Sequence, residues 1–237
     1  MVAEEIKALA FDVFGTVVDW RATIIEEGAR FSAGTGVSLD WGQFADAWRG
    51  RYRPSMDRVM RGELPWMTID ELHRLALDEV LREFDLESLT EGQRAGLNRI
   101  WHRLRPWPDA VPGLTRLRAR YVLATLSNGN VALLVDLAKY ARLPWDCVLS
   151  AELARAYKPD PAVYRMACAL LDLRPAQVMM VAARQDDLRA ARAEGLRTAF
   201  IPRPLEHGPD AASDPTPDAA CDVVAADLVD LARRLGA

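Results

Sequence analysis

Hydrophobic and polar positions follow two different periods along this chain of 237 residues. The first apolar run, residues 6–11, has Lys7 as its polar member and is short enough for a buried strand of a parallel sheet. Gly15 and Thr16 supply the turn that follows the run. We therefore expect Asp12 at the carboxyl end of a strand, where ligands of open α/β sheets bind.

Helical spacing dominates the stretch after this strand, and no strand is expected within it. The pattern predicts a helical cap of residues 20–107, inserted after the first strand into a core of residues 1–19 and 108–237. The apolar positions that carry the pattern are Ile69, Leu72, Ala76 and Val80, and segments 44–48 and 97–104 behave similarly.

From residue 111 onward, short apolar runs alternate with helical stripes. This βαβ alternation predicts an α/β fold with a Rossmann-like parallel sheet that helices cover on both faces. Segment 202–217, rich in proline and aspartate, is typical of a surface loop. Strands are expected at 121–126, 147–150, 178–182 and 198–201. Helices are indicated by Val131, Leu134, Val135 and Ala138, by Val163, Met166, Ala167, Leu170 and Leu171, by Leu188 and Ala191 with Gly195 as the stop, and by 228–235.

Composition limits the partners and the location. Half of the residues are hydrophobic, enough for a sizeable core, and the net charge of -4 argues against a nucleic-acid or anionic membrane surface. Three cysteines without paired or metal-type spacing indicate a reducing compartment. No signal peptide or bilayer-spanning run is visible, so we expect a cytoplasmic protein, which could form a homodimer.

The residues around Asp12 carry the first chemical signal. Taken alone, Asp12 could be a solvated acid or a helix N-cap as well as a functional group. The sequence Phe-Asp-Val-Phe-Gly-Thr, however, resembles the first motif of the haloacid dehalogenase superfamily. Phosphatases of that superfamily read Asp-x-Asp-Gly-Thr, whereas its dehalogenases read Asp-x-Phe/Tyr-Gly-Thr. The resemblance implies that Asp12 is a nucleophile and that Val13 and Phe14 adjoin the substrate.

Phe14 separates these two chemistries. In the phosphatases, the second aspartate protonates the departing alcohol, and a Mg²⁺ ion offsets the phosphate charge. A phenyl ring cannot transfer a proton, but a departing halide needs none. Phe14 therefore favours a dehalogenase over a phosphatase.

Two further motifs follow predicted strands. Ser127, Asn128 and Gly129 match the superfamily's Ser/Thr motif, in which the hydroxyl and the next amide bind the nucleophile or the substrate; by themselves they form an ordinary turn. Lys158 matches the lysine motif, and a cation beside Asp12 would keep it ionised, although a lysine between prolines is also typical of a surface loop. The resemblance places Tyr164 in the pocket; packing is the alternative.

The segment 181–188 matches less closely. The resemblance aligns Asp187 with the acid that positions the hydrolytic water, whereas Arg184 and Gln185 replace smaller or aromatic polar residues. Asp12 with Asp186 or Asp187 could instead bind Mg²⁺, as in the phosphatases. Asp186 would also suit a helix N-terminus.

The predicted cap contributes one more candidate. Arg49, after Trp48, corresponds to an arginine that reaches the substrate from dehalogenase caps, and a guanidinium can donate two parallel hydrogen bonds to a carboxylate. Arg51 and Arg53 compete for this role, and an exposed cap arginine is the alternative. We expect one or two of six tryptophans to wall a dry pocket and the rest to pack helices. They are Trp20, Trp41, Trp48, Trp66, Trp101 and Trp107. No role is assigned to the histidines.

Together, the motifs resemble the type II 2-haloacid dehalogenases. This resemblance implies hydrolysis of a short 2-haloacid through an ester on Asp12, with inversion at carbon and no cofactor. Arg49 and Asn128 would hold the carboxylate or the halide. Asp187, helped by Lys158, Ser127 and Thr16, would position the water. The alternatives are a Mg²⁺-dependent phosphatase and a non-catalytic member that binds a small carboxylate or a partner.

Overall fold

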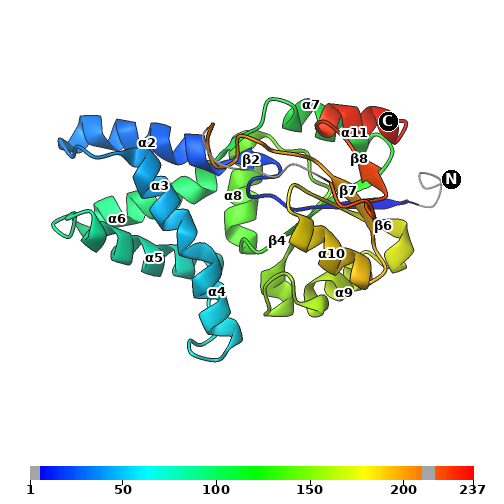
Figure 1. The fold of residues 1–237 in the computed structure, drawn as a ribbon, viewed down its shortest axis with the longest axis horizontal. Helices are drawn as coiled ribbons and strands as arrows, with labels where there is room; N and C mark the ends of the chain where they lie inside the picture. The colour runs from blue at the N-terminus through cyan, green and yellow to red at the C-terminus, as the bar shows by residue number, and fades with distance from the viewer. Residues whose placement is uncertain (1–5, 210–216) are drawn as a thin grey trace.

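A six-stranded parallel sheet forms the centre of the computed structural model, which describes residues 6–209 and 217–237. The strand order is β5-β4-β1-β6-β7-β8 (Figure 1). The chain moves from β1 to β4 and β5 on one side and then crosses back to β6, β7 and β8 on the other. The strands are β1 Ala8–Phe11, β4 Val122–Ser127, β5 Cys147–Ser150, β6 Val178–Ala182, β7 Arg197–Phe200 and β8 Val223–Val224. The predicted α/β class is confirmed.

Helices cover both faces of this sheet. Neighbouring residues of β1 point to opposite faces, so Leu9 packs into one apolar cluster and Ala10 into the other. Leu114, Leu133 and Leu231 share the cluster of Leu9, on the face of α7, α8 and α11, whereas α9 and α10 cover the opposite face. The helices are α7 Ala110–Arg118, α8 Val131–Ala141, α9 Pro161–Leu170, α10 Gln185–Ala193 and α11 Leu228–Arg234, with short 3-10 turns η2 Ala151–Ala154 and η3 Pro175–Gln177.

Between β1 and β4, a block of helices lies beside the sheet, at the left of Figure 1. We call residues 20–103 the helical block. Thr68 and Thr90 each begin a helix with a capping box, which satisfies backbone N–H groups that a helix start leaves unpaired. The block consists of α2 Trp20–Thr35, α3 Trp41–Gly50, α4 Tyr52–Met60, α5 Ile69–Glu83, α6 Glu91–Asn98 and the 3-10 turn η1 Arg99–Arg103.

Two short strands were not expected from the sequence. β2 Val18–Asp19 and β3 Arg105–Pro106 pair antiparallel where the chain enters and leaves the helical block. The prediction of no strand in 20–107 was therefore wrong at β3. A two-residue ladder depends on backbone pairing between distant segments, so no local hydrophobic alternation marks it. The edge strand β8 is equally short and was missed for the same reason.

Two predicted apolar stripes are displaced. Val135 and Leu170 are 36% and 59% exposed, whereas Leu137 and Cys168 are buried. The helical period was right, but hydrophobic side chains also occur at the margins of a buried face, so composition alone does not fix its centre. Of the predicted loop 202–217, residues 210–216 lie outside the described part of the chain. Among the described residues, no helix is long and apolar enough to cross a membrane.

Candidate active site

Asp12 directly follows β1 at the point where the strand order reverses. The residue is 7% exposed, and its Oδ2 accepts a hydrogen bond of 2.7 Å from the Thr16 hydroxyl. The Thr16 oxygen in turn accepts from the Ala183 N–H at 2.9 Å, which ties the loop after β1 to the loop after β6. Gly15, in the turn between Asp12 and Thr16, has φ +88°, and a Cβ at this residue would collide with the Glu206 carboxylate. The turn therefore requires glycine.

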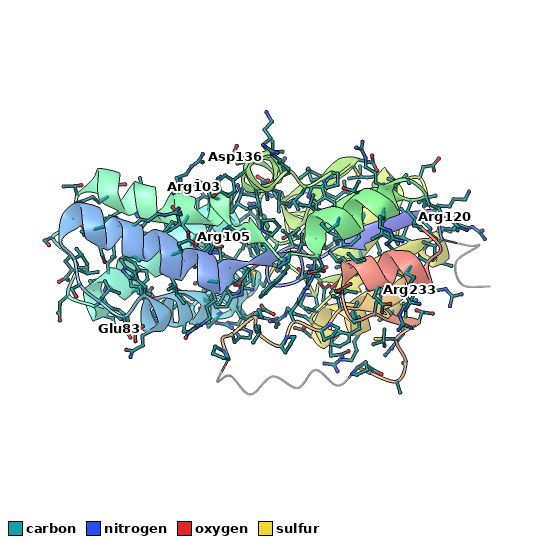
Figure 2. The ribbon with its side chains drawn as sticks, turned by 90° about the horizontal axis from the view of Figure 1, so that it is seen from above. Glu83, Arg103, Arg105, Arg120, Asp136 and Arg233 are labelled. Carbon is teal, nitrogen blue, oxygen red and sulfur yellow. The ribbon has the colours of Figure 1, made fainter. Side chains whose placement is uncertain are left out.

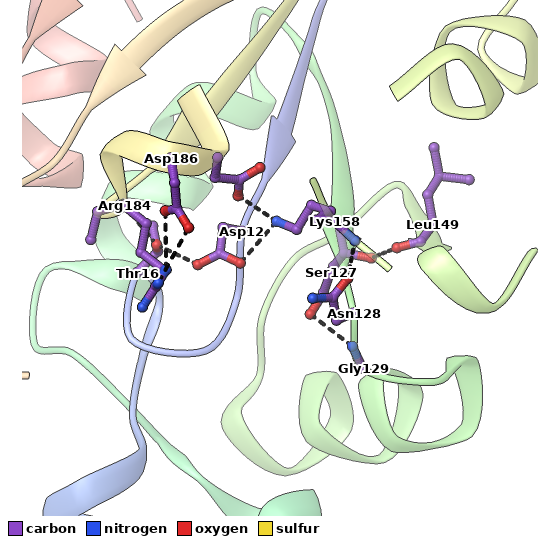
Figure 3. Close-up of polar contacts among 12 residues, drawn as sticks. Asp12, Thr16, Ser127, Asn128, Gly129, Leu149, Lys158, Arg184 and Asp186 are labelled. Atoms are coloured by element: carbon purple, nitrogen blue, oxygen red, sulfur yellow. Dashed lines mark hydrogen bonds and ion pairs between the residues drawn. The ribbon is translucent and has the colours of Figure 1, made fainter. Parts of the chain in front are cut away.

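Lys158 lies between two carboxylates (Figure 3). Its Nζ donates to Asp12 Oδ1 at 3.0 Å and also contacts Asp187 Oδ2. Burial by itself favours the neutral amine, but the charges of Asp12 and Asp187 prevail and raise the pKa of Lys158. The ammonium therefore stays charged and neutralises part of the negative charge around Asp12.

Asp187, at the start of α10, has a second donor. The Tyr164 hydroxyl donates to Asp187 Oδ1 at 2.7 Å, and Tyr164 is fully buried. Burial and the neighbouring charge of Asp187 raise the pKa of Tyr164, so the phenol keeps its proton. Burial also raises the pKa of Asp187, and the charge of Asp12 adds to this effect against the contacts from Lys158 and Tyr164.

The loop after β4 completes this edge of the sheet. The Lys158 N–H donates to Asn128 Oδ1 at 2.7 Å, which fixes the orientation of the Asn128 amide. The Ser127 hydroxyl accepts a hydrogen bond from the Gly129 N–H at 3.1 Å, within its own loop. The expected contact of Ser127 with Asp12 or with the substrate stays a prediction. Phe14 ring carbons lie 3.1 Å from where a Cβ of residue 129 would be. A side chain at residue 129 would therefore require the Phe14 ring to shift by a few tenths of an ångström.

A cavity of about 520 Å³ separates this edge from the helical block. The core contributes Asp12, Asn128 and Lys158 to its walls, and α3 and α4 contribute Arg49 and Tyr52. Such a volume suits a small molecule, and the polar groups converge on one side of it.

Arg49 enters the cavity through a box of aromatic rings. Its guanidinium carbon lies 4.2 Å from the ring centroid of Tyr52, 5.4 Å from Trp20 and 6.0 Å from Phe14. Its Nη1 is buried and, among the described residues, has no hydrogen-bond partner. A buried guanidinium nitrogen without an acceptor is costly, and an anionic ligand would satisfy it.

The two competing arginines have acidic partners. Arg51 pairs with Glu79 and Glu83, and Figure 2 shows Glu83 at the outer margin of the helical block. Arg53 pairs with Asp57 at 2.9 Å and lies 3.9 Å from Asp186 at the cavity edge. Of the three, Arg49 is the one that the structure leaves ready for an anion.

Arg184 and Asp186 form a pair at the cavity wall. Arg184 Nε lies 3.3 Å from Asp186 Oδ1, and Arg184 precedes Gln185, the first residue of α10. Burial alone would raise the pKa of Asp186, but the charge of Arg184 prevails and lowers it. Among the described residues, no three His, Cys, Asp or Glu side chains form a group that could hold a metal ion.

Val13 is 1% exposed in the apolar core and is not among the residues lining the cavity, so its contact with the substrate stays a prediction. Sequence reasoning missed the wall residues Tyr52 and His207. It also missed Glu206, which does not line the cavity but accepts a hydrogen bond from Trp20 Nε1 at 3.1 Å. A signal existed for Tyr52, which lies three residues after Arg49, the spacing of one helical face. His207 and Glu206 lie in a loop without periodicity.

The fold and this site define a class of protein. A family model described as haloacid dehalogenase-like hydrolase matches residues 6–195. A curated (S)-2-haloacid dehalogenase of Pseudomonas sp. (strain CBS-3) is 32% identical over 206 residues, which cover 84% of this chain and 86% of the relative. The chain therefore belongs to the haloacid dehalogenase-like hydrolases.

The chain is also similar to solved structures of 2-haloacid dehalogenases. An L-2-haloacid dehalogenase and a defluorinating L-2-haloacid dehalogenase are 49% and 47% identical to this chain, each with a TM-score of 0.95. They are matched over 98% of this chain and over 99% and 96% of their own lengths. The enzyme from Xanthobacter autotrophicus, solved with chloropropionic acid covalently bound, is 28% identical with a TM-score of 0.81, over 98% of both chains.

Proposed function

We propose that this protein hydrolyses short 2-haloacids to 2-hydroxy acids through an ester on Asp12. One observation carries the proposal: Asp12, held by Lys158, shares a cavity with Arg49, whose buried Nη1 awaits an anion. Phe14 stands where a phosphatase would need its second acid. The dehalogenase names of the relatives support the same chemistry.

In the first step, an Asp12 oxygen attacks the carbon that bears the halogen. The bonding electron pair leaves with the halide, and the aspartyl ester forms. Arg49 and Asn128 hold the substrate carboxylate or the departing halide. The aromatic walls exclude water from the substrate carboxylate and from Asp12. This exclusion strengthens the contacts of Arg49 and Asn128 with the substrate and leaves Asp12 less solvated. In-line attack inverts the configuration at carbon.

In the second step, water attacks the carbonyl carbon of the ester and releases the 2-hydroxy acid. We assign Asp187 to orient and deprotonate this water, since it lies beside Asp12 through their shared partner Lys158. Tyr164 and Lys158 hold Asp187, while Thr16 holds Asp12. Ser127 keeps the Asn128–Gly129 loop in place. The reaction needs no cofactor in this scheme.

The helical block acts as a cap in this proposal. It supplies Arg49 to a cavity whose nucleophile comes from the sheet, so the two parts must meet for the reaction. The cytoplasm is the expected location. Light scattering after gel filtration tests whether the chain forms a homodimer.

A single turnover in ¹⁸O-water with 2-chloropropionate tests the mechanism. The hydroxyl oxygen of the first product comes from Asp12, so the label must appear in the Asp12 peptide, detected by mass spectrometry. Label in the product alone would refute the ester. Absence of halide release from chloro-, bromo- and fluoro-acids alike would favour the non-catalytic alternative. Fluoride belongs in this panel because one similar structure is of a defluorinating enzyme.

A further inference from the structure

Tyr52 occupies a position in the cavity that the proposed mechanism leaves without a role. It begins α4 and lines the cavity together with Asp12 and Asn128. Its ring supports the Arg49 guanidinium at 4.2 Å and meets the Phe14 ring edge-on at 6.4 Å between centroids. The ring is therefore fixed against the same guanidinium that awaits an anion.

The polar end of Tyr52 lies near the Asn128 amide. Because Asn128 Oδ1 accepts from the Lys158 N–H, its Nδ2 must serve the cavity side, where it reaches Met56 Sδ at 3.4 Å. Sulfur is a weak acceptor, so this amide nitrogen keeps donor capacity. Asn128 opposes the rise in the pKa of Tyr52, which places its amide close to the phenol. A donor to the phenol oxygen would leave the phenol proton for another acceptor in the cavity.

The phenol remains a donor throughout the neutral range. Burial raises the pKa of Tyr52, and the charge of Asp12 adds to this effect, whereas Arg49 and Asn128 oppose it. The hydroxyl therefore keeps its proton beside a nucleophile that is itself an anion. A neutral O–H can stabilise a new anion without adding a charge to the site.

The geometry points to Tyr52 as a third hydrogen-bond donor, beside Arg49 and Asn128, to the halide that leaves when Asp12 attacks. The C–X electron pair departs with the halide, and the phenol proton stays on the Tyr52 oxygen. This inference rests on the proposed function and deepens it: Tyr52 would set how strongly the rate depends on the halogen. A smaller halide concentrates its charge and gains more from each donor.

The test compares leaving groups in Tyr52→Phe, which keeps the ring under Arg49 and removes only the hydroxyl. Single-turnover ester formation is measured with 2-bromopropionate and 2-chloropropionate. We expect chloride departure to slow about 10- to 100-fold and bromide departure less, so that the bromide-to-chloride rate ratio rises at least about threefold. Hydrolysis of the preformed ester, which releases no halide, should keep the parent rate.

Tyr121→Phe is the matched control. The Tyr121 hydroxyl is buried and donates to the Leu235 carbonyl at 2.8 Å, far from the cavity, so its loss lowers stability without changing the rate ratio. An unchanged ratio in Tyr52→Phe, or an equal rise in Tyr121→Phe, would overturn the inference while the parent still releases halide. A parent that forms no ester would overturn the proposed function itself, and the role of Tyr52 with it.

Discussion

At the scale of single residues, the site is organised by one lysine that two carboxylates share. Asp12 and Asp187 both contact Lys158 Nζ, so their combined negative charge exceeds that of their common partner. Burial and this imbalance raise the pKa of Asp187 even though a cation touches it. The acid that we assign to the hydrolytic water is therefore more easily protonated than an ordinary aspartate.

This arrangement predicts a pH dependence of ester hydrolysis. An ordinary aspartate has a pKa of about 3.9, and the pKa of Asp187 is raised. As the pH is lowered, Asp187 therefore takes up its proton, and the rate of ester hydrolysis begins to fall, before the pH reaches about 3.9. Tyr164→Phe removes a hydrogen bond that lowers the pKa of Asp187, and should move this acid limb to higher pH. Single-turnover rates between pH 4 and 8 measure it, and a limb that moves down or stays in place would contradict the assignment.

Arg49, in the last turn of α3, and Arg51, the residue that follows α3, offer a matched pair of substitutions. Arg49→Lys replaces a planar fork with a point charge in the aromatic box, so kcat/KM for 2-chloropropionate should fall at least about 100-fold. Arg51→Lys alters a cation that already pairs with Glu79 and Glu83, and should change kcat/KM less than about twofold. Equal losses in both variants would show that Arg49 acts through the stability of the helical block.

At the scale of elements, a histidine joins the helical block to the sheet domain. His102 of η1 is 3% exposed; its Nε2 faces Asp70 of α5 at 2.9 Å and its Nδ1 faces Asp136 of α8 at 2.8 Å. Asn130, the N-cap residue of α8, also donates to Asp70 at 3.0 Å. Figure 2 shows Asp136 where the two parts of the molecule adjoin. These contacts anchor α5 against the loop that carries Asn128.

Removing His102 should weaken this junction. His102→Leu leaves Asp70 and Asp136 without their shared partner, so the free energy of unfolding in urea at pH 7 should fall by about 2 kcal/mol. His207→Gln, at a half-exposed histidine, should cost less than about 0.5 kcal/mol. A smaller loss in His102→Leu than in this control would refute the junction.

The free energies of unfolding of the parent and of His102→Leu can also be compared at acid pH. Burial by itself raises the pKa of Asp70, but hydrogen bonds from His102 and Asn130 prevail and lower it. A lowered carboxyl pKa stabilises the fold above the unfolded value, near 3.9, and this stabilisation is lost as the pH falls through the folded value. The difference between parent and His102→Leu should therefore shrink below about pH 4.

At the scale of the whole molecule, the carboxylates Asp12, Asp186 and Asp187 at the sheet edge each contact a cationic side chain. Lys158 serves Asp12 and Asp187, and Arg184 serves Asp186, so the carboxylates at the sheet edge already have cations. A bound Mg²⁺ would have to compete with these cations for the same oxygens. The molecule as a whole thus favours organic anions over metal-bound phosphate.

The pairing of these carboxylates with cationic side chains predicts how enzyme activity responds to a metal chelator. Halide release from 2-chloropropionate should be the same with and without EDTA, measured with an ion-selective electrode. Added Mg²⁺ should not produce hydrolysis of an alkyl phosphate such as glycerol 2-phosphate, because its alkoxide leaving group needs a proton that Phe14 cannot supply. Loss of activity in EDTA that Mg²⁺ restores would revive the phosphatase alternative.

The sequence by itself determined the class of fold and the positions of its main strands along the chain. Runs such as 147–150 and 178–182 became strands at those same residues, because burial on both faces of a parallel sheet demands an unbroken apolar run. Asp12, Lys158 and Asp187 were also identifiable, since each follows a strand or lies within a motif.

Only the tertiary structure decided which side chains share the cavity. Arg49, Arg51 and Arg53 are close competitors in sequence. The packing of α3 and α4 against the sheet edge leaves Arg49 without an acidic partner within residues 6–209 and 217–237. Tyr52 and the His102 junction depend likewise on contacts between distant segments. Local patterns encode period and burial, whereas the partner of a charged group is set by how separate elements pack.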